Sequence, residues 1–163
     1  MFERRFVTPV EQISIDEIDS WMAPASVKRP LGDALDAEAV ALNYYELEPG
    51  ETFGFGYHRH PEQEELFYVL AGAATFETEA GEIEVSSGEA VRFAPGEWQL
   101  GRNAGDERVI ALALGAPADA DTEMLTACPD CDERTPARVE PTDDRSALLT
   151  ICVDCGTVTG RYD

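Results

Sequence analysis

Basic residues are scarce in this sequence, and lysine is almost absent. The 163 residues include 12 basic and 33 acidic side chains, which give a formal net charge of −21, and Lys28 is the single lysine. A surface of that charge repels a phosphate backbone, so nucleic-acid binding is disfavoured. Because the acidic residues are scattered, we interpret them as a solvated coat, as in halophilic proteins that work in high salt. An acidic surface that recruits a basic partner is the alternative.

Long apolar runs are also missing. No stretch has the roughly 18 consecutive apolar residues of a membrane span. The two arginines near the N-terminus are not followed by the apolar segment of a signal peptide. We therefore expect a cytoplasmic protein without a membrane anchor. The hydrophobic fraction of 44% is ordinary, so a packed core is feasible.

Cysteine is limited to four residues in two close pairs. Cys128 and Cys131 form one C-x2-C pair, Cys152 and Cys155 form the other, and twenty residues separate the pairs. In a cytoplasmic protein this pattern indicates metal binding rather than disulfides. Two such pairs close a tetrahedral four-thiolate site that suits Zn²⁺, and Gly156 supplies a residue that tolerates positive φ. Because all four thiolates serve as ligands, the sequence predicts a structural zinc rather than a redox-active dithiol.

The segment with these cysteines, residues 124–163, resembles zinc ribbons, small β modules found in nucleic-acid-handling and many other proteins. The resemblance rests on the two cysteine pairs. A module of about forty residues buries too little surface to fold alone, so metal binding would supply much of its folding free energy. From Asp130 to Asp163 there are eight acidic residues and four arginines. This balance argues against nucleic acid and leaves a protein partner or a purely stabilising role.

The remaining chain divides into an arm, a barrel and a linker. We expect an N-terminal arm over residues 1–38, a β-barrel over 39–116 and a linker over 117–123. In the barrel, short apolar or alternating segments are separated by Gly or Pro turns about every 8 to 12 residues, which predicts an all-β fold. One hairpin is expected around Ala80–Gly81. The arm should pack on the barrel or on a second subunit.

Within the arm we expect one short helix and one loop. The helix would lie within residues 8–21 and be capped by Ser14 or Thr8. Residues 27–39 are interpreted as a loop, in which Pro30 and Gly32 act as breakers.

The two histidines of the chain, His58 and His60, lie in one alternating stretch from Tyr57 to Gly72. Side chains two residues apart in a strand point to the same face, so both imidazoles should lie together. Glu65 heads the next apolar strand. Two imidazoles and one carboxylate inside a small barrel form a ligand set for a divalent metal with open coordination positions.

Residues 39–115 resemble the cupins, a family of small jelly-roll barrels. The first cupin motif, G(X)5HXH(X)3,4E(X)6G, is matched by His58, His60, Glu65 and Gly72, whereas Thr52 stands at its leading glycine. The second motif, G(X)5PXG(X)2H(X)3N, corresponds to Gly88, Ala94, Gly96, Gln99 and Asn103. Gln99 therefore stands where the family usually has its third histidine.

The resemblance implies a jelly-roll barrel with a divalent metal, Fe, Mn, Ni or Zn, held by His58, His60 and Glu65. It makes Gln99 a candidate fourth ligand through its side-chain oxygen, and it also implies a homodimer. A neutral amide oxygen is a poorer donor than imidazole, so affinity for a transition metal should fall. The alternative is a barrel without metal, in which the histidines hydrogen-bond with Glu65 and Gln99.

Residues beside these ligands are assigned by strand parity. Tyr57 and Arg59 should point away from the histidines, and Glu64 away from Glu65. Trp98 is expected to pack rather than to contact a substrate.

Three functions are open at this point. The first is a metal-dependent enzyme that acts on a small polar molecule by oxygenation, isomerisation or lyase chemistry, because the resemblance includes dioxygenases and sugar isomerases. The second is a non-catalytic domain that binds or senses a small molecule and contacts a protein partner through the ribbon. The third is a metal-free structural barrel. No catalytic residue other than the ligands can be named.

Overall fold

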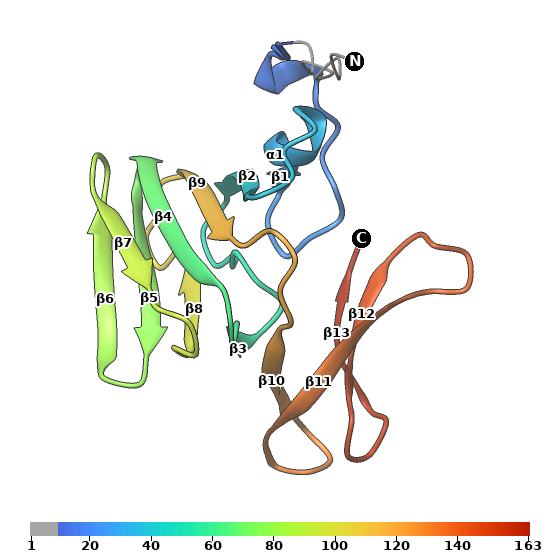
Figure 1. The fold of residues 1–163 in the computed structure, drawn as a ribbon. Helices are drawn as coiled ribbons and strands as arrows, with labels where there is room; N and C mark the ends of the chain where they lie inside the picture. Colours follow the sequence, from blue (N-terminus) through green and yellow to red (C-terminus); the bar gives the residue numbers. More distant parts are fainter. Residues whose placement is uncertain (1–9) are drawn as a thin grey trace, which may run out of the picture.

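A computed structural model describes residues 10–163, in which two antiparallel sheets contain nearly all the regular structure (Figure 1). The first sheet has five strands, in the order β1 (Val27–Arg29), β2 (Ala41–Leu47), β9 (Val109–Ala116), β4 (Glu64–Ala71) and β7 (Ala90–Phe93). The second has eight, in the order β13 (Val158–Tyr162), β12 (Leu148–Cys152), β11 (Glu133–Pro141), β10 (Glu123–Cys128), β3 (Tyr57–Arg59), β8 (Gln99–Arg102), β5 (Ala73–Thr78) and β6 (Gly81–Ser86). The predicted all-β jelly roll is confirmed. The predicted hairpin is also present, because β5 pairs with β6 across a turn at residues 79–80.

Phenylalanine rings fill the space between the two sheets of the barrel. Ring centroids of Phe53 and Phe67 lie 5.0 Å apart, those of Phe67 and Phe76 4.9 Å, and those of Phe76 and Phe93 5.4 Å. Each buried ring contributes roughly 1.5–3 kcal/mol through the apolar area it removes from water. A Cβ atom at Gly101 would lie 2.5 Å from the Phe76 ring, so β8 needs glycine there. This packed core holds the strands that carry the candidate ligands.

Part of the expected loop at residues 27–39 is regular structure, so that prediction is wrong for residues 27–29 and 31–34. β1 pairs with β2 and places Lys28 opposite Tyr45. The single-turn helix α1 (Leu31–Ala34) follows Pro30 directly. Proline suits the start of a helix, where its missing N–H would have no partner, so Pro30 introduces a helix here instead of preventing one. The arm therefore supplies an edge strand of the barrel.

The expected short helix is a 3₁₀ turn over Ile15–Glu17. It follows Ser14, one of the two predicted caps, whereas Thr8 lies outside the described residues. Within residues 10–163, no helix combines the length and the apolar character that crossing a membrane requires.

The cysteine-bearing segment continues a sheet of the barrel (Figure 1). β10 pairs with β3, with Met124 opposite His58 and Leu125 opposite Tyr57. β11, β12 and β13 then extend the same sheet. The division into a linker over 117–123 and a module over 124–163 stays a prediction. Whatever the boundary, the two parts share a ladder of backbone hydrogen bonds.

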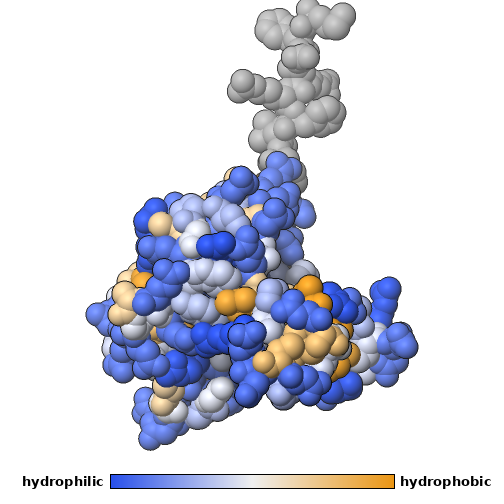
Figure 2. Space-filling model, turned by 90° about the horizontal axis from the view of Figure 1, so that it is seen from below, coloured by the Kyte–Doolittle hydropathy of each residue, from blue (hydrophilic) through white to orange (hydrophobic). Residues whose placement is uncertain are grey.

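The surface seen in Figure 2 is mostly hydrophilic, with a few apolar patches. Hydrophilic side chains therefore cover most of this face.

Candidate metal centres

The three predicted barrel ligands converge. His58 extends from β3, His60 follows that strand directly, and Glu65 extends from β4. One donor atom of each lies within 4.8 Å of the other two. Nε2 of His60 is 3.2 Å from Oε2 of Glu65, and Nε2 of His58 is 3.9 Å from the same oxygen. The side chains are only 12 to 16% exposed, so they are shielded from bulk water.

Hydrogen bonds at Nδ1 orient both imidazoles. Nδ1 of His58 lies 2.8 Å from the carbonyl oxygen of Gly56. Nδ1 of His60 lies 2.9 Å from Oγ1 of Thr122 and 3.3 Å from the carbonyl oxygen of Asp121. A proton on each Nδ1 satisfies these carbonyls, so Nε2, which faces Glu65, is the nitrogen that could bind a metal once it carries no proton of its own. Metal-binding histidines are held in this way by partners on the second ring nitrogen.

Gln99 lies beside these ligands and is 1% exposed. Its Nε2 donates to Oε2 of Glu65 at 3.0 Å and lies 3.0 Å from Nε2 of His58. Its Oε1 has no hydrogen-bond partner among the described residues, and a buried oxygen in that state is costly. Rotation of the amide exchanges the two atoms and turns Oε1 toward the ligands, where a cation would satisfy it. The donor set therefore fits a divalent metal bound by two nitrogens and two oxygens.

Glu65 is held as a carboxylate. Burial raises its pKa, but hydrogen bonds with His58 and His60 outweigh burial and bring the pKa to about 2. The hydrogen bond with Glu65 in turn raises the pKa of His60. The site thus combines a carboxylate with two imidazoles whose orientation is held by hydrogen bonds at Nδ1.

His58, His60 and Glu65 line a cavity of about 520 Å³, a size that suits a small molecule. Barrel residues such as Tyr45 and Phe53 form part of its wall. β11 of the cysteine segment adds Ala137, Arg138 and Val139. The cysteine segment therefore helps to shape the same cavity that the histidines face.

Side chains expected to point away from the site do so. The ring of Trp98 stacks on that of Tyr57 with centroids 5.4 Å apart, and the Arg59 guanidinium lies 4.8 Å from the centre of the Trp98 ring. Glu64 pairs with Arg92. Trp98 therefore packs on the face of the sheet opposite to the histidines.

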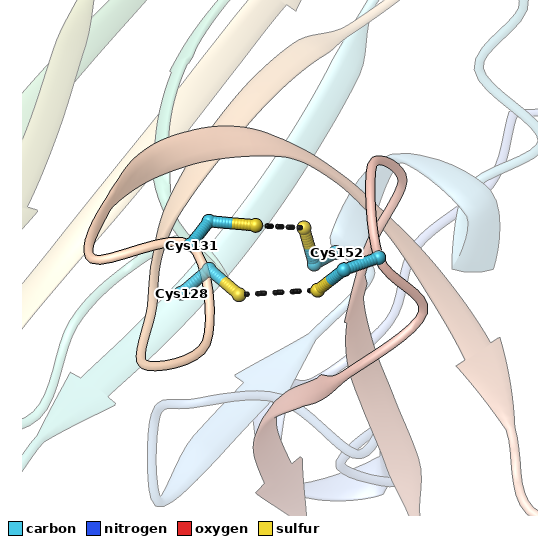
Figure 3. A group of neighbouring side chains, drawn as sticks. Cys128, Cys131 and Cys152 are labelled. Carbon is cyan, nitrogen blue, oxygen red and sulfur yellow. Dashed lines mark hydrogen bonds between the residues drawn. The ribbon is translucent and has the colours of Figure 1, made fainter.

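The four cysteines meet between two hairpin loops. Figure 3 shows Cys128 and Cys131 on one loop, facing Cys152 on the other. Sγ of Cys128 is 3.5 Å from that of Cys155, Sγ of Cys131 is 3.9 Å from that of Cys152, and all four lie within 4.8 Å of one another. This cluster fits a zinc-ribbon site with four thiolate ligands.

The two loops have matching backbones. The residue after each pair has a positive φ, 59° at Asp132 and 79° at Gly156. Its N–H donates to the carbonyl oxygen of the first cysteine, Cys128 or Cys152, at 2.9 Å in both loops. Gly156 thus adopts the positive φ expected from the sequence, and Asp132 occupies the equivalent position in the other loop.

Hydrogen bonding prepares two of the thiols for ionisation. The Thr135 hydroxyl, 3.0 Å from Sγ of Cys152, is the main reason that the pKa of this thiol falls to about 6. Side-chain and backbone hydrogen bonds with Thr157 lower the pKa of Cys155. Burial raises the pKa of Cys128, and hydrogen bonds with the neighbouring thiols raise that of Cys131. A bound cation would supply the charge that deprotonates these last two.

Sequence reasoning gave no role to Lys28, which lines the barrel cavity. The residue lies in the segment interpreted as a loop, so its place in the barrel wall was not foreseen. The sequence feature that could have drawn attention to Lys28 is that it is the single lysine, because the other eleven basic residues are arginines.

Residues 43–115 match the protein family described as a cupin domain. A search of curated protein sequences finds none that matches this chain.

Several solved structures share the fold. A sugar phosphate isomerase of the cupin superfamily from Silicibacter pomeroyi is 20% identical, with a TM-score of 0.59, and the match covers 91% of this chain and 92% of that one. A predicted oxalate decarboxylase from Thermotoga maritima is 20% identical, with a TM-score of 0.57, over 66% of this chain and 99% of that one. The polyketide cyclase RemF from Streptomyces resistomycificus is 20% identical, with a TM-score of 0.61, over 75% and 89%. At these identities the likeness concerns the fold alone.

Proposed function

Residues 43–115 are a cupin domain, and we propose that this domain binds a divalent metal and uses it in a reaction of a small polar molecule. The ligands are His58, His60 and Glu65, with Gln99 as the fourth donor. The observation that supports this proposal is the convergence of three donor atoms within 4.8 Å at the wall of a 520 Å³ cavity. The orientation of both imidazole Nε2 atoms toward the Glu65 carboxylate adds to it.

The metal, Fe, Mn, Ni or Zn, supplies a Lewis acid when bound. The chain's own residues do the rest: the imidazoles bind through Nε2, and Glu65 contributes the negative charge. The packed phenylalanine core keeps the ligand-bearing strands in place. The similar structures are named for an isomerase, a decarboxylase and a cyclase, so isomerisation and lyase chemistry stay within the proposal. Oxygenation stays within it because two histidines and one carboxylate are also the ligand set of non-haem iron oxygenases.

A non-catalytic binding or sensing domain is the second candidate. One observation favours it: Glu65 is the only carboxylate among the cavity-lining residues of the described chain, and it is a proposed ligand. Tyr45 is a poor source of a base, because burial holds its pKa far above the usual value. Lys28 is then the remaining group that could move a proton.

Metal analysis of the full chain tests the proposal. We expect about two metal ions per chain after exposure to Fe²⁺, Mn²⁺, Ni²⁺ and Zn²⁺, one of them zinc at the cysteines. His58→Ala should keep about one, and Arg59→Ala, on the opposite face of β3, should keep about two. About one ion in the unaltered protein would refute the barrel site.

Turnover then separates the two candidates. A panel of small polar substrates is screened with the unaltered protein and with His58→Ala. Turnover that disappears in His58→Ala supports the enzyme. Saturable binding without turnover supports the sensing domain.

We also propose that the protein is a cytoplasmic homodimer. An apolar strip on the outer face of the five-stranded sheet supports the dimer: Leu66, Tyr68 and Leu70 are 37 to 44% exposed. Leu66 lies opposite Leu114, and Tyr68 opposite Leu112, so the strip crosses from β4 to β9. Covering such a strip by a second copy would remove apolar area from water. Light scattering tests this, and a monomer at working concentration would refute it.

A further inference from the structure

The barrel cavity differs in charge from the rest of the protein. The whole chain has 33 acidic and 12 basic residues, whereas the residues lining the cavity include one carboxylate, Glu65, and two cations, Lys28 and Arg138. Because Glu65 is a proposed metal ligand, a divalent cation would more than neutralise it. The cavity is then a positive hollow in a negative protein, and such a hollow concentrates small anions.

Lys28 is the cation that lacks a protein partner. Within residues 10–163 its Nζ makes no hydrogen bond or ion pair, and it lies 5.9 Å from the centre of the Tyr45 ring. Arg138, by contrast, is paired with Glu140 at 2.6 Å. Burial lowers the pKa of Lys28, and the charges of the Glu65 and Asp33 carboxylates partly offset that effect without an ion pair to either. The cavity wall thus contains a partly buried ammonium that has no anionic partner among residues 10–163.

An ammonium in this position needs negative charge from elsewhere. Removing a charged group from water without a partner is costly, and such groups are normally paired. Lysine also differs from arginine in kind, because its ammonium is a compact charge with three N–H donors that can follow an oxygen atom. A ligand that brings an anionic oxygen would supply the missing partner.

We propose that Lys28 is the anion-binding residue of the cavity and that the ligand is a small oxyanion, a carboxylate or a phosphate monoester. One anionic oxygen accepts hydrogen bonds from the Lys28 ammonium, and the rest of the molecule reaches the group formed by His58, His60 and Glu65. This inference rests on the proposed function for the metal-facing end of the ligand only.

The single lysine makes a direct test practical. Selective ¹³C labelling of lysine gives one Cε signal in the full-length protein, because Lys28 is the only lysine. The protein is loaded with diamagnetic Zn²⁺, its metal content is measured, and it is titrated with oxalate, with glycerol 2-phosphate and with uncharged glycerol. We expect a saturable shift of the Lys28 signal with at least one anion and none with glycerol. The anion that shifts the signal identifies the carboxylate or the phosphate class.

A charge-removing variant gives the second readout. Lys28→Met keeps an unbranched apolar side chain and removes the ammonium. Calorimetry should show anion binding weakened by about 10- to 100-fold, which is the range for losing a charged hydrogen bond, with unchanged metal content. Arg161→Met removes a positive charge from an exposed pair with Asp163 and should change the affinity by no more than about twofold.

The outcomes separate this inference from the proposed function. Equal anion affinity in the unaltered protein and Lys28→Met, with the barrel metal bound, overturns the role of Lys28 and leaves the metal proposal intact. A protein that binds no barrel metal refutes the proposed function. In that protein, the Lys28 Cε signal during the anion titration tests the anion site independently of the metal. A saturable shift supports the site, and an unchanged signal overturns it. The signal needs no variant, so it also decides the matter if Lys28→Met fails to fold.

Discussion

The barrel site and the cysteine site are two candidate metal centres that differ in their donor atoms and in their access to a cavity. In the cysteine site, four sulfur atoms come from two loops with matching backbones. As ligands of one tetrahedral metal ion they would leave no position for a substrate. In the barrel site, nitrogen and oxygen donors come from different strands and face a cavity. A closed thiolate set stabilises a fold, whereas an open mixed set leaves room for a ligand. The difference agrees with the proposal that the cysteine site stabilises the fold and that the barrel site binds a ligand.

The largest expected effect is the loss of the cysteine site. Cys152→Ser removes the thiol with the lowest pKa of the four and should release the structural zinc, whose binding contributes about 10–16 kcal/mol in small zinc modules. Hydrogen exchange should show protection lost over β10–β13 and kept over the core strands β4 and β9. Val153→Ser, an exposed change in the same loop, is the control. Full protection in Cys152→Ser would contradict a structural role for zinc.

The next effect concerns the identity of the fourth donor. Gln99→His replaces a weak amide donor by imidazole, and we expect Ni²⁺ or Zn²⁺ to bind the barrel about 10- to 100-fold more tightly. Gln99→Leu, which removes the donor, should bind no more tightly than the unaltered protein. Competition with a chromophoric chelator measures both affinities. Equal affinities in all three proteins would place Gln99 outside the ligand set.

A smaller effect is expected from a partner of a ligand. Thr122→Val removes the hydroxyl 2.9 Å from Nδ1 of His60, while the Asp121 carbonyl at 3.3 Å still accepts its proton. We expect barrel-metal affinity to fall by about tenfold, at the low end for such partners. The same chelator competition measures it. The matched control is Thr78→Val, at the β5–β6 turn, and an equal fall in that variant would mean a general loss of packing.

The smallest effect lies between the two regions. Arg134 of β11 donates to both carboxylate oxygens of Glu77 on β5, at 2.8 and 2.9 Å. This hydrogen bond lowers the pKa of Glu77, so its contribution is present above the unfolded pKa and is lost as the pH falls through the folded pKa. Because both side chains are partly exposed, we expect about 0.2–1 kcal/mol. A double-mutant cycle with Glu77→Gln and Arg134→Met, measured by urea unfolding at pH 7 and pH 3, should show weaker coupling at pH 3 than at pH 7.

The parts that could be predicted from the sequence are those encoded over short distances. Each cysteine loop is four residues long, and parity within one strand places His58 beside His60. Gln99 was found by its place in a motif, although its contact with His58 runs across β3 and β8.

Partner choice between distant strands could not be predicted in the same way. The pairing of Lys28 with Tyr45 depends on β2 offering a free edge, and nothing in residues 27–39 encodes that. β10 follows a polar, alanine-rich stretch typical of a linker, so its pairing with β3 was not expected. Both omissions concern residues that line the cavity.

The ladder between β3 and β10 has a practical consequence for anyone who wishes to study the barrel by itself. In a chain that ends after residue 116, the β3 edge that now pairs with β10 would have unpaired N–H and C=O groups. The cavity would also be open on the side that β11 now covers. Such an edge recruits foreign strands, so the shortened protein should aggregate. The smallest fragment suited to transfer into another protein is therefore the barrel together with the cysteine segment.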